Sequence, residues 1–271
     1  MKIGVAGCGR MGLGMARAMQ RAGLEVTGFD IRPPGAFGEF APHMQIDPAA
    51  FASDRQVILS VVRDVAQTEA LLFEDQAILT RAPALTHLVI CSTLSPRYLA
   101  DLRTRVPGAI RMVDAPMSGA QVAADEARLS FMLGGEVDDL DLLEPVFRTM
   151  GPKIHRMGAP GAGMTAKVLN NFVAATSMVA TRRVLDWADD LGVDPARLLA
   201  LMHDSSGQTW FGSNFDVIEF ACDGYDPDNT IGIVRKDVES CLDAIDPSHH
   251  AGLPEALVAA IAAQTPRDRK P

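Results

Sequence analysis

The sequence predicts an α/β protein in two domains. A doubly wound parallel sheet over residues 1–160 is followed by a smaller all-α domain over residues 161–271, and a long helix links the two. Three observations predict this. Short apolar runs alternate with helix-like stretches up to about residue 157, a glycine-rich loop follows the first run, and no strand-like run occurs after Gly158. Alternating strands and helices are typical of a parallel sheet with helices on both faces.

The first domain contains six apolar runs that we interpret as strands. Several are apolar throughout, as expected for strands that are covered on both faces. The predicted strands lie at residues 2–6, 25–29, 57–62, 87–91, 110–115 and 129–135, and helical patterns lie between them at 12–22, 65–72, 95–105 and 138–150.

The second domain begins with residues 163–191, which contain no proline and are rich in Ala, Val, Leu and Met. We predict one long helix there, ended by Gly192 and the turn Val193-Asp194-Pro195. Shorter helices are predicted at 195–203, 213–221, 232–245 and 254–264. Because a long apolar helix favours burial against a second copy of the chain, we expect a homo-oligomer, a dimer or a tetramer.

Composition excludes several classes of partner. The formal net charge is −9 and the pI is about 5.1, so the chain lacks the basic surface that nucleic acids and anionic membranes attract. We therefore expect no nucleic-acid and no membrane partner. The four cysteines form no CxxC pair, so no metal site is predicted, and free thiols favour a reducing compartment. No leader segment is recognised at the start, and we expect a cytoplasmic protein.

A G-x-G-x-x-G loop follows the first predicted strand and opens the first predicted helix. It contains Gly7, Gly9 and Gly12, with Arg10 and Met11 between the last two glycines. In this context the first glycine makes a tight turn, the second lets the backbone approach a pyrophosphate, and the third allows close packing of helix on strand. The anion binds at the helix N-terminus. The loop therefore predicts a dinucleotide-binding site of the Rossmann type.

Asp30 ends the second predicted strand, 18 residues after Gly12. A carboxylate at this point accepts hydrogen bonds from the adenosine ribose, and it repels a 2′-phosphate by roughly 1–4 kcal/mol at close range. NAD is therefore the favoured cofactor. Arg32 keeps NADP as the alternative, because its side chain could turn toward a phosphate.

Three further segments extend the interpretation beyond nucleotide binding. They are CSTLSP at 91–96, DAPMSGAQVAADEARLSFMLGG at 114–135 and GAPGAGMTAKVLNN at 158–171. Together with the glycine loop and Arg235-Lys236-Asp237, they resemble the β-hydroxyacid dehydrogenase family, which includes 3-hydroxyisobutyrate dehydrogenase and is related to 6-phosphogluconate dehydrogenase. The resemblance implies reversible hydride transfer between C3 of a small β-hydroxy acid, or the matching aldehyde acid, and C4 of nicotinamide, in a cleft between the domains.

The resemblance also implies roles for individual residues. Lys167 would be the general acid and base, and Asn171, four residues further along the same helix face, would orient it or bind the substrate oxygen. The turn formed by Ser118, Gly119 and Ala120 would bind the substrate carboxylate. Residues implied in cofactor binding besides the loop and the Asp30 region are Val62, Thr93 and Lys236, and Thr93 would also face the substrate.

Two alternatives remain open at this stage. An imine reductase would share the fold, but such enzymes usually replace the lysine that is present here at position 167. A nucleotide-sensing binding module without catalysis is the other alternative, and the intact Lys167 and Asn171 count against it. The chain departs from the family pattern at Ala127, where a glycine is expected, and in a second domain that is short at its C-terminal end, so we expect a changed substrate pocket.

Overall fold

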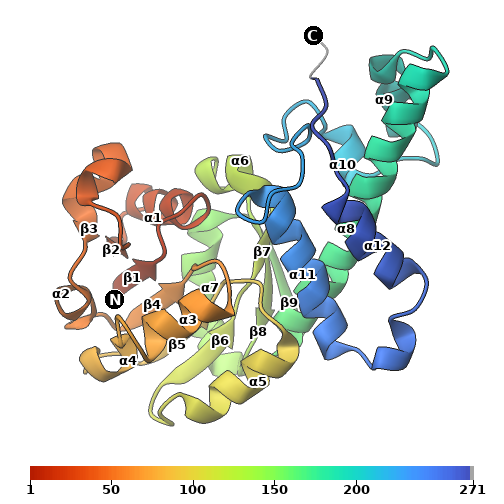
Figure 1. Ribbon diagram of the computed structural model, residues 1–271. Helices are drawn as coiled ribbons and strands as arrows, with labels where there is room; N and C mark the ends of the chain where they lie inside the picture. The colour runs from red at the N-terminus through yellow and green to blue at the C-terminus, as the bar shows by residue number, and fades with distance from the viewer. Residues whose placement is uncertain (269–271) are drawn as a thin grey trace. The chain divides into compact units, whose positions relative to one another are not determined.

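The computed structural model describes residues 1–268 of the chain. The chain divides into two compact units, residues 1–167 and 168–271. The division falls within the helix α8 (Ala162–Asp190), so this helix contributes its first turns to one unit and the rest to the other. Figure 1 labels the elements along the chain.

The first unit is built on one sheet. Within residues 1–268 its strands are β1 (Lys2–Ala6), β2 (Glu25–Phe29), β3 (Met44–Gln45), β4 (Val57–Ser60), β5 (His87–Ile90), β6 (Arg111–Asp114), β7 (Met117–Ser118), β8 (Ser130–Gly134) and β9 (Lys153–Gly158). Their order is β3-β2-β1-β4-β5-β6-β8-β7, and β9 pairs with β8. The chain leaves β1 toward β2 and returns to its other side at β4, so the strand order reverses at β1, where this fold binds ligands.

One part of the sheet is not parallel, contrary to the prediction. The pairs from β3 to β6 are parallel, but β8 runs antiparallel to both β6 and β7. The physical reason is the length of the connections. Only Ala115 and Pro116 separate β6 from β7, and eleven residues separate Ser118 from Ser130, whereas a parallel crossover needs a dozen or more.

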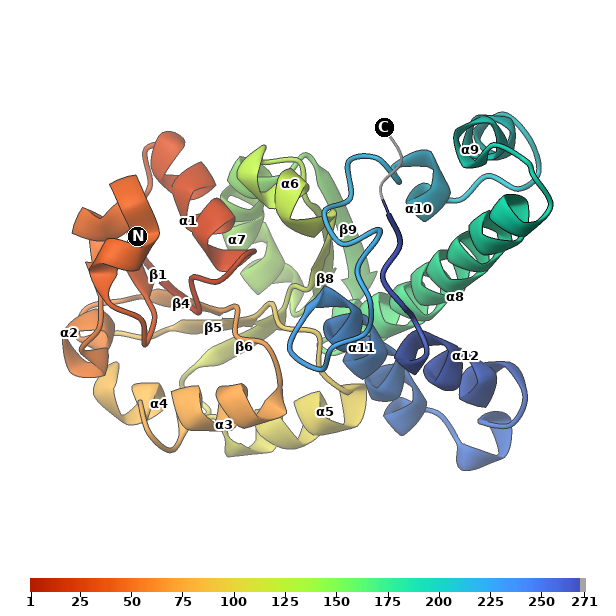
Figure 2. The same ribbon diagram turned by 45° about the horizontal axis from the view of Figure 1, so that its top comes forward.

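Helices cover both faces of this sheet, as predicted. On one face lie α1 (Gly12–Arg21), α6 (Ala120–Asp125) and α7 (Val137–Met150), and on the other lie α3 (Val65–Leu72), α4 (Ile78–Arg81) and α5 (Pro96–Arg105) (Figure 2). Met15 and Phe147 are fully buried in the first apolar layer, and Leu71 and Leu99 are buried in the second. The sequence analysis did not predict the 3-10 helix η1 (Pro34–His43) or the short helices α2 (Pro48–Ala52), α4 and α6.

The second unit is helical. Besides α8 it contains α9 (Pro195–His203), α10 (Trp210–Ser213), α11 (Thr230–Ala244), the 3-10 helix η2 (Pro247–His249) and α12 (Leu253–Ala262). The prediction of a helix over 213–221 is wrong. Residues 214–222 form successive turns whose backbone hydrogen bonds are mostly from i to i+3, and these turns bury Ile218, Phe220 and Ala221.

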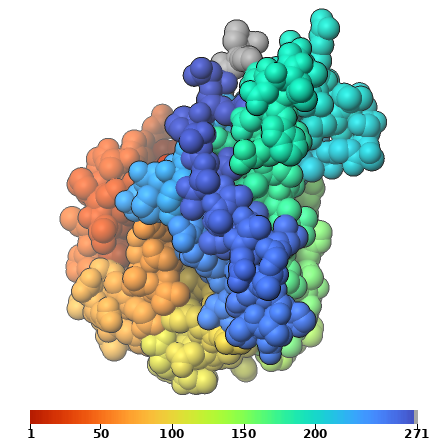
Figure 3. All heavy atoms as spheres, turned by 45° about the vertical axis from the view of Figure 1, so that its right-hand side comes forward, coloured from red at the N-terminus to blue at the C-terminus, as the bar shows by residue number. Residues whose placement is uncertain are grey.

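The end of the described chain packs on α8. Arg182 of α8 is almost fully buried and donates hydrogen bonds to the backbone carbonyls of Asp223 and Thr265. Arg267 forms ion pairs with Asp186 and Asp189 on the same helix. In Figure 3 this segment, in dark blue, lies against the green residues of α8. The described C-terminal segment is therefore an ordered part of the second unit.

Candidate active site

The glycine loop joins β1 to α1 and brings three different constraints together. A Cβ at Gly7, whose φ is +93°, would lie 2.8 Å from the backbone of Val61, and a Cβ at Gly12 would lie 2.1 Å from the carbonyl oxygen of Gly7. A Cβ at Gly9 would meet no atom within 4 Å. The first and third glycines are thus required by packing, and the second leaves the backbone open to a ligand.

The N-terminus of α1 has the properties of an anion site. Met11 occupies the N-cap position, its side chain accepts no hydrogen bond from the helix, and the first turn contains no acidic residue. The amide groups of the first turn and the positive end of the helix dipole therefore favour a negative group from outside the chain. These residues fit the diphosphate of a dinucleotide.

Asp30 and Arg32 lie beside this loop. Asp30 follows β2, and both of its carboxylate oxygens accept hydrogen bonds from Arg32, from Nε at 3.0 Å and from Nη2 at 3.0 Å. Nη2 of Arg32 also donates to the carbonyl oxygen of Cys8, in the glycine loop, at 2.9 Å. The hydrogen bond with Asp30 raises the pKa of Arg32. Burial raises the pKa of the Cys8 thiol to about 12, so Cys8 stays protonated and is not a nucleophile.

Val62 and Thr93 follow two neighbouring parallel strands, β4 and β5, at their carboxyl ends. Ser92 Oγ donates a 2.6 Å hydrogen bond to the carbonyl oxygen of Val62, which joins the two segments. Thr93 is half-buried beside this bond. The carboxyl ends of β1, β4 and β5 lie at one edge of the sheet, and that edge is where doubly wound sheets bind their ligands.

The turn from Ser118 to Ala120 leads from β7 into α6 and has unusual backbone conformations. The φ of Gly119 is 141°, and the φ of Ala120 is 59°. The two positive φ values bend the backbone sharply between β7 and α6. Ala127, in the turn between α6 and β8, has φ 54°. This left-handed conformation is why a glycine is expected there, although the chain holds an alanine.

The N-terminus of α8 is held by Asp114, a residue that the sequence analysis did not select. Asp114 ends β6 and is fully buried, and its carboxylate accepts hydrogen bonds from the amides of Gly161 at 2.6 Å and Met164 at 2.8 Å. Burial raises the pKa of Asp114. A Cβ at Gly163 would lie 2.4 Å from the carbonyl oxygen of Met132, so the first turn of α8 lies directly on the backbone of β8. The start of α8 is therefore fixed to the sheet.

Lys167 lies in the second turn of α8 and is only 7% exposed. Lysine is one of the residues least often buried, so the burial of Lys167 needs an explanation. Asn171 follows one turn later and donates a 2.6 Å hydrogen bond to Oδ2 of Asp237. Nζ of Lys236 lies 2.7 Å from Oδ1 of the same carboxylate. Asp237 thus joins Asn171 and Lys236.

The structure gathers the predicted residues into local groups. The glycine loop meets Asp30 and Arg32, Val62 is tied to the residue before Thr93, and Asn171 meets Lys236 through Asp237. Sequence reasoning missed Ser92, Asp114 and Asp237. A signal existed for the last two, because Asp114 opens the DAPMSG segment at a strand end and Asp237 is the acid of the Arg-Lys-Asp segment.

Comparisons with known proteins agree with this geometry. Residues 2–158 match the family described as the NAD binding domain of 6-phosphogluconate dehydrogenase, and residues 161–268 match the family described as NAD-binding of NADP-dependent 3-hydroxyisobutyrate dehydrogenase. An L-threonate dehydrogenase of Cupriavidus necator is 30% identical over 262 residues, which cover 95% of this chain and 87% of that protein.

Two further relatives extend the comparison. A 3-hydroxyisobutyrate dehydrogenase of Pseudomonas aeruginosa is 31% identical over 211 residues, covering 77% of this chain and 71% of that protein. The solved structure of a Mycobacterium tuberculosis 3-hydroxyisobutyrate dehydrogenase with L-serine has a TM-score of 0.73 at 25% identity and covers 97% of this chain and 96% of that one. These similarities do not favour an imine reductase or a non-catalytic module. The chain belongs to the β-hydroxyacid dehydrogenase family and is an NAD(P)-dependent oxidoreductase.

Proposed function

We propose that the chain catalyses the reversible oxidation of a small β-hydroxy acid at C3, with Lys167 as the group that takes and returns the hydroxyl proton. The observation that carries this proposal is the burial of Lys167, at 7% exposure, in a helix whose first turn is fixed to the sheet by Asp114. A buried lysine amine in a rigid position is suited to proton transfer at one defined atom of a substrate.

The residues that would hold the cofactor are those of the glycine loop, with Asp30 and Arg32 on its adenosine side and Val62, Thr93 and Lys236 toward the nicotinamide. When bound, nicotinamide supplies the hydride acceptor or donor. The open backbone at Gly9 and the uncapped N-terminus of α1 support binding of the diphosphate.

Lys167 and Asn171 would act on the substrate hydroxyl. Removing an ammonium group from water favours its neutral form, and the neutral amine can accept the hydroxyl proton during oxidation. In the reductive direction the same group returns that proton. Asn171 lies one turn away on the helix, and its hydrogen bond to Asp237 holds its side-chain amide in place.

Ser118, Gly119 and Ala120 would bind the substrate carboxylate. The hydroxyl of Ser118 and the amides that follow it provide donors, and the positive φ values of Gly119 and Ala120 support an anion-binding turn. The relatives act, by their names, on 3-hydroxyisobutyrate, L-threonate and L-serine, which are all small acids with a hydroxyl group. We therefore infer a substrate of this class.

Location and assembly belong to the same proposal. All four cysteines are free and buried, which supports a reducing compartment, the cytoplasm. Within residues 1–268 no helix has the length and hydropathy of a membrane span. Leu169, Val173 and Trp187 of α8 are each at least half exposed. These side chains support a homo-oligomer, which light scattering would measure.

The test is a comparison of Lys167→Met with Lys153→Met, a matched change at an exposed lysine on β9. Formation of reduced cofactor is followed with 3-hydroxyisobutyrate, glycerate, L-serine and L-threonate. We expect Lys167→Met to lower kcat by roughly a thousandfold, because general acid–base catalysis contributes about 10²–10⁴. Binding of the reduced cofactor, measured by fluorescence, should persist in the same variant.

Two results would contradict the proposal. One is a Lys167→Met enzyme that retains more than about a tenth of the wild-type rate, since a proton-transfer group is worth far more than that. The other is a wild-type chain that binds the dinucleotide but turns over none of the four acids.

A further inference from the structure

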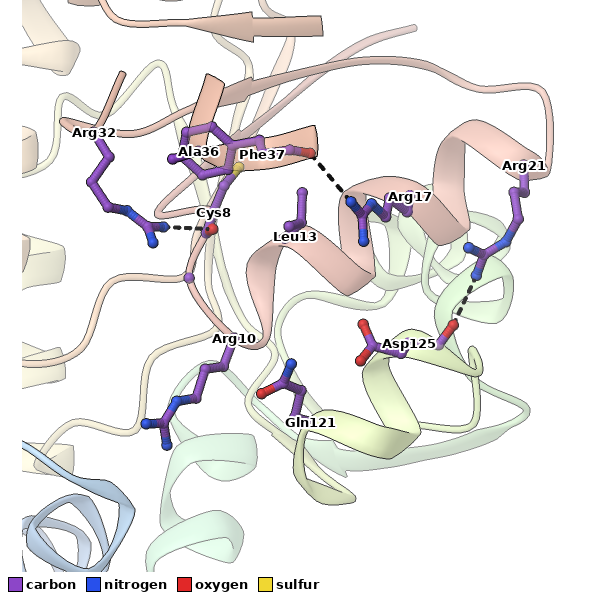
Figure 4. Close-up of a pocket in the computed structure, with 11 residues that line it drawn as sticks. Cys8, Arg10, Leu13, Arg17, Arg21, Arg32, Ala36, Phe37, Gln121 and Asp125 are labelled. Atoms are coloured by element: carbon purple, nitrogen blue, oxygen red, sulfur yellow. Dashed lines mark hydrogen bonds between the residues drawn. The ribbon is translucent and has the colours of Figure 1, made fainter. Parts of the chain in front are cut away.

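Each end of the proposed cofactor site is held by a side chain that bonds to the backbone of another segment. At the adenosine end, Nη2 of Arg32 donates to the carbonyl oxygen of Cys8 in the glycine loop, as Figure 4 shows. At the nicotinamide end, the backbone amide of Leu94 donates a 3.3 Å hydrogen bond to Sδ of Met164. This second contact joins the segment after β5 to the first turn of α8.

Met164 forms hydrogen bonds with both its backbone and its side chain. Its amide donates to Oδ2 of Asp114 at 2.8 Å, while its sulfur accepts from Leu94. Met164 is 0% exposed and Leu94 is 1% exposed, and both belong to the apolar layer that contains Leu99 of α5. A thioether is a weak acceptor, but a buried amide that loses its acceptor has no water to replace it. The contact is therefore costly to break.

The hydrogen bond to Met164 fixes one side of Thr93. On the other side Oγ of Ser92 donates to the carbonyl oxygen of Val62 at 2.6 Å. Leu94 follows Thr93 directly, and Ser95 is then the N-cap of α5. Thr93 is thus placed between two anchored residues, of which Ser92 is tied to the segment after β4 and Leu94 is tied to α8.

The same turn of α8 leads to Lys167. Met164 precedes Lys167 by three positions, a spacing that makes two residues neighbours on a helix surface. The turn cannot shift to follow a displaced partner, because a Cβ at Gly163 would already lie 2.4 Å from the carbonyl oxygen of Met132. The position of Thr93 relative to the backbone of Lys167 therefore depends on the contact between Leu94 and the sulfur.

We propose that Met164 is a positioning residue, whose thioether holds the Thr93 segment in a fixed position relative to the turn of α8 that carries Lys167. This inference rests on the roles proposed above for Thr93 and Lys167. Hydride transfer and proton transfer take place in one complex, and a displacement of about 1 Å can lower a rate by up to roughly a hundredfold. A core methionine that also holds a loop is therefore worth more to the rate than to substrate binding.

The experiment compares Met164→Leu with Met150→Leu. Both methionines are 0% exposed, and Met150 ends α7 in the other apolar layer, so it is the matched control. Leucine is close to methionine in volume and is tolerated in cores, but it accepts no hydrogen bond. Met164→Gln is the rescue variant, because its side-chain oxygen can accept the amide of Leu94. Urea unfolding verifies that each variant is folded.

Two measurements are made on the full chain. Hydrogen–deuterium exchange is followed by mass spectrometry in peptides that cover residues 91–96, without ligands. Steady-state rates are measured with the acids that the wild type oxidises, carrying protium or deuterium at C3. The first measurement reports on the contact itself, and the second reports on the transfer that it positions.

Met164→Leu should raise the exchange rate of the Leu94 amide about tenfold, since its acceptor is lost. We expect kcat to fall about tenfold. The KM values of acid and cofactor should stay within about twofold. The deuterium isotope effect on kcat should rise, because hydride transfer becomes slower than the other steps. Met150→Leu should keep the wild-type values. Met164→Gln should restore the exchange rate and kcat to within about threefold of wild type.

Three outcomes overturn the proposal. One is Met164→Leu with the exchange rate or the kcat of Met150→Leu. Another is a fall in kcat that is matched by an equal rise in KM. The third is a folded Met164→Gln that is as slow as Met164→Leu, because packing would then matter and the acceptor would not. Failure of the proposed function looks different: the wild type turns over none of the acids, while the exchange measurement still reports on the contact.

Discussion

The helices α1 and α8 both begin at the edge of the same sheet, and both need a glycine in the first turn to lie close to other backbone. Their N-termini are satisfied differently. At α8 the buried carboxylate of Asp114 accepts two amide hydrogen bonds, whereas at α1 the side chain of the N-cap residue Met11 accepts none. The chain supplies its own anion to one helix and leaves the other to an anion from outside.

We interpret the N-terminus of α8 as structural and the N-terminus of α1 as a binding site for an anion. Amides of a first turn need acceptors, and an internal carboxylate fixes the helix in one position. That rigidity is useful at α8, which carries Lys167 in its second turn. At α1 an internal acid would occupy the position that we propose for the cofactor diphosphate. This interpretation can be tested by adding an acid at the N-terminus of α1 and by removing the acid that binds the N-terminus of α8.

The largest effect is expected from giving α1 an acid of its own. Met11→Asp places a carboxylate at the N-cap, where it satisfies the first-turn amides and repels the diphosphate. We expect dinucleotide affinity to fall about a hundredfold, measured by calorimetry. Met11→Asn has the same shape without the charge, so the difference between the two variants isolates electrostatics. Equal affinities for Asp and Asn would show that α1 does not bind the diphosphate.

A smaller effect is expected from weakening the internal acid of α8. Asp114→Asn presents an amide donor to backbone N–H groups that need acceptors, and we expect the free energy of unfolding in urea to fall by about 2 kcal/mol at neutral pH. The gap should widen in acid. Burial raises the pKa of Asp114, so the folded wild type binds an extra proton between the ordinary pKa, about 3.9, and the raised value.

The sign follows from that proton. Stability contributed by a group with a raised pKa is fully present below its unfolded pKa and is lost as the pH rises through its folded pKa. The free energy of unfolding of the wild type should therefore rise relative to that of Asp114→Asn as the pH falls through this window. If the difference in free energy of unfolding between the wild type and Asp114→Asn became smaller in acid, the pKa of Asp114 would not be raised in the folded state.

The smallest effect is expected at Asp237 of α11, which accepts a hydrogen bond from Asn171. Asp237→Asn keeps an oxygen for Asn171 but removes the charge that faces Lys236. We expect kcat to fall about fivefold, because the side chains stay close while their electrostatic anchor weakens. Asp243→Asn, a change at a carboxylate further along α11, is the control. A loss as large as that of Lys167→Met would mean that Asp237 itself takes part in the proton transfer.

Much of the first unit could be predicted from sequence, because its signals are local. The apolar runs and the helical periods predicted β1, β2, β4, β5 and their helices to within about two residues, as is usual for such boundaries. The strand β8 was predicted, but its antiparallel direction and the turns at 214–222 were not. Both depend on connection length and on which apolar side chains find a common core, and neither leaves a periodic pattern.

The site divides in the same way. By itself, the sequence determined the glycine loop, the acid 18 residues beyond it and the Lys167–Asn171 pair, since each depends on spacing within one loop or helix. Only the tertiary structure decided that Arg32 neutralises Asp30 while reaching Cys8, that Asp114 holds a helix 50 residues away, and that Asp237 anchors Asn171. Such pairs form because strand order and packing bring distant segments together. The spacing of residues along the chain does not predict that order.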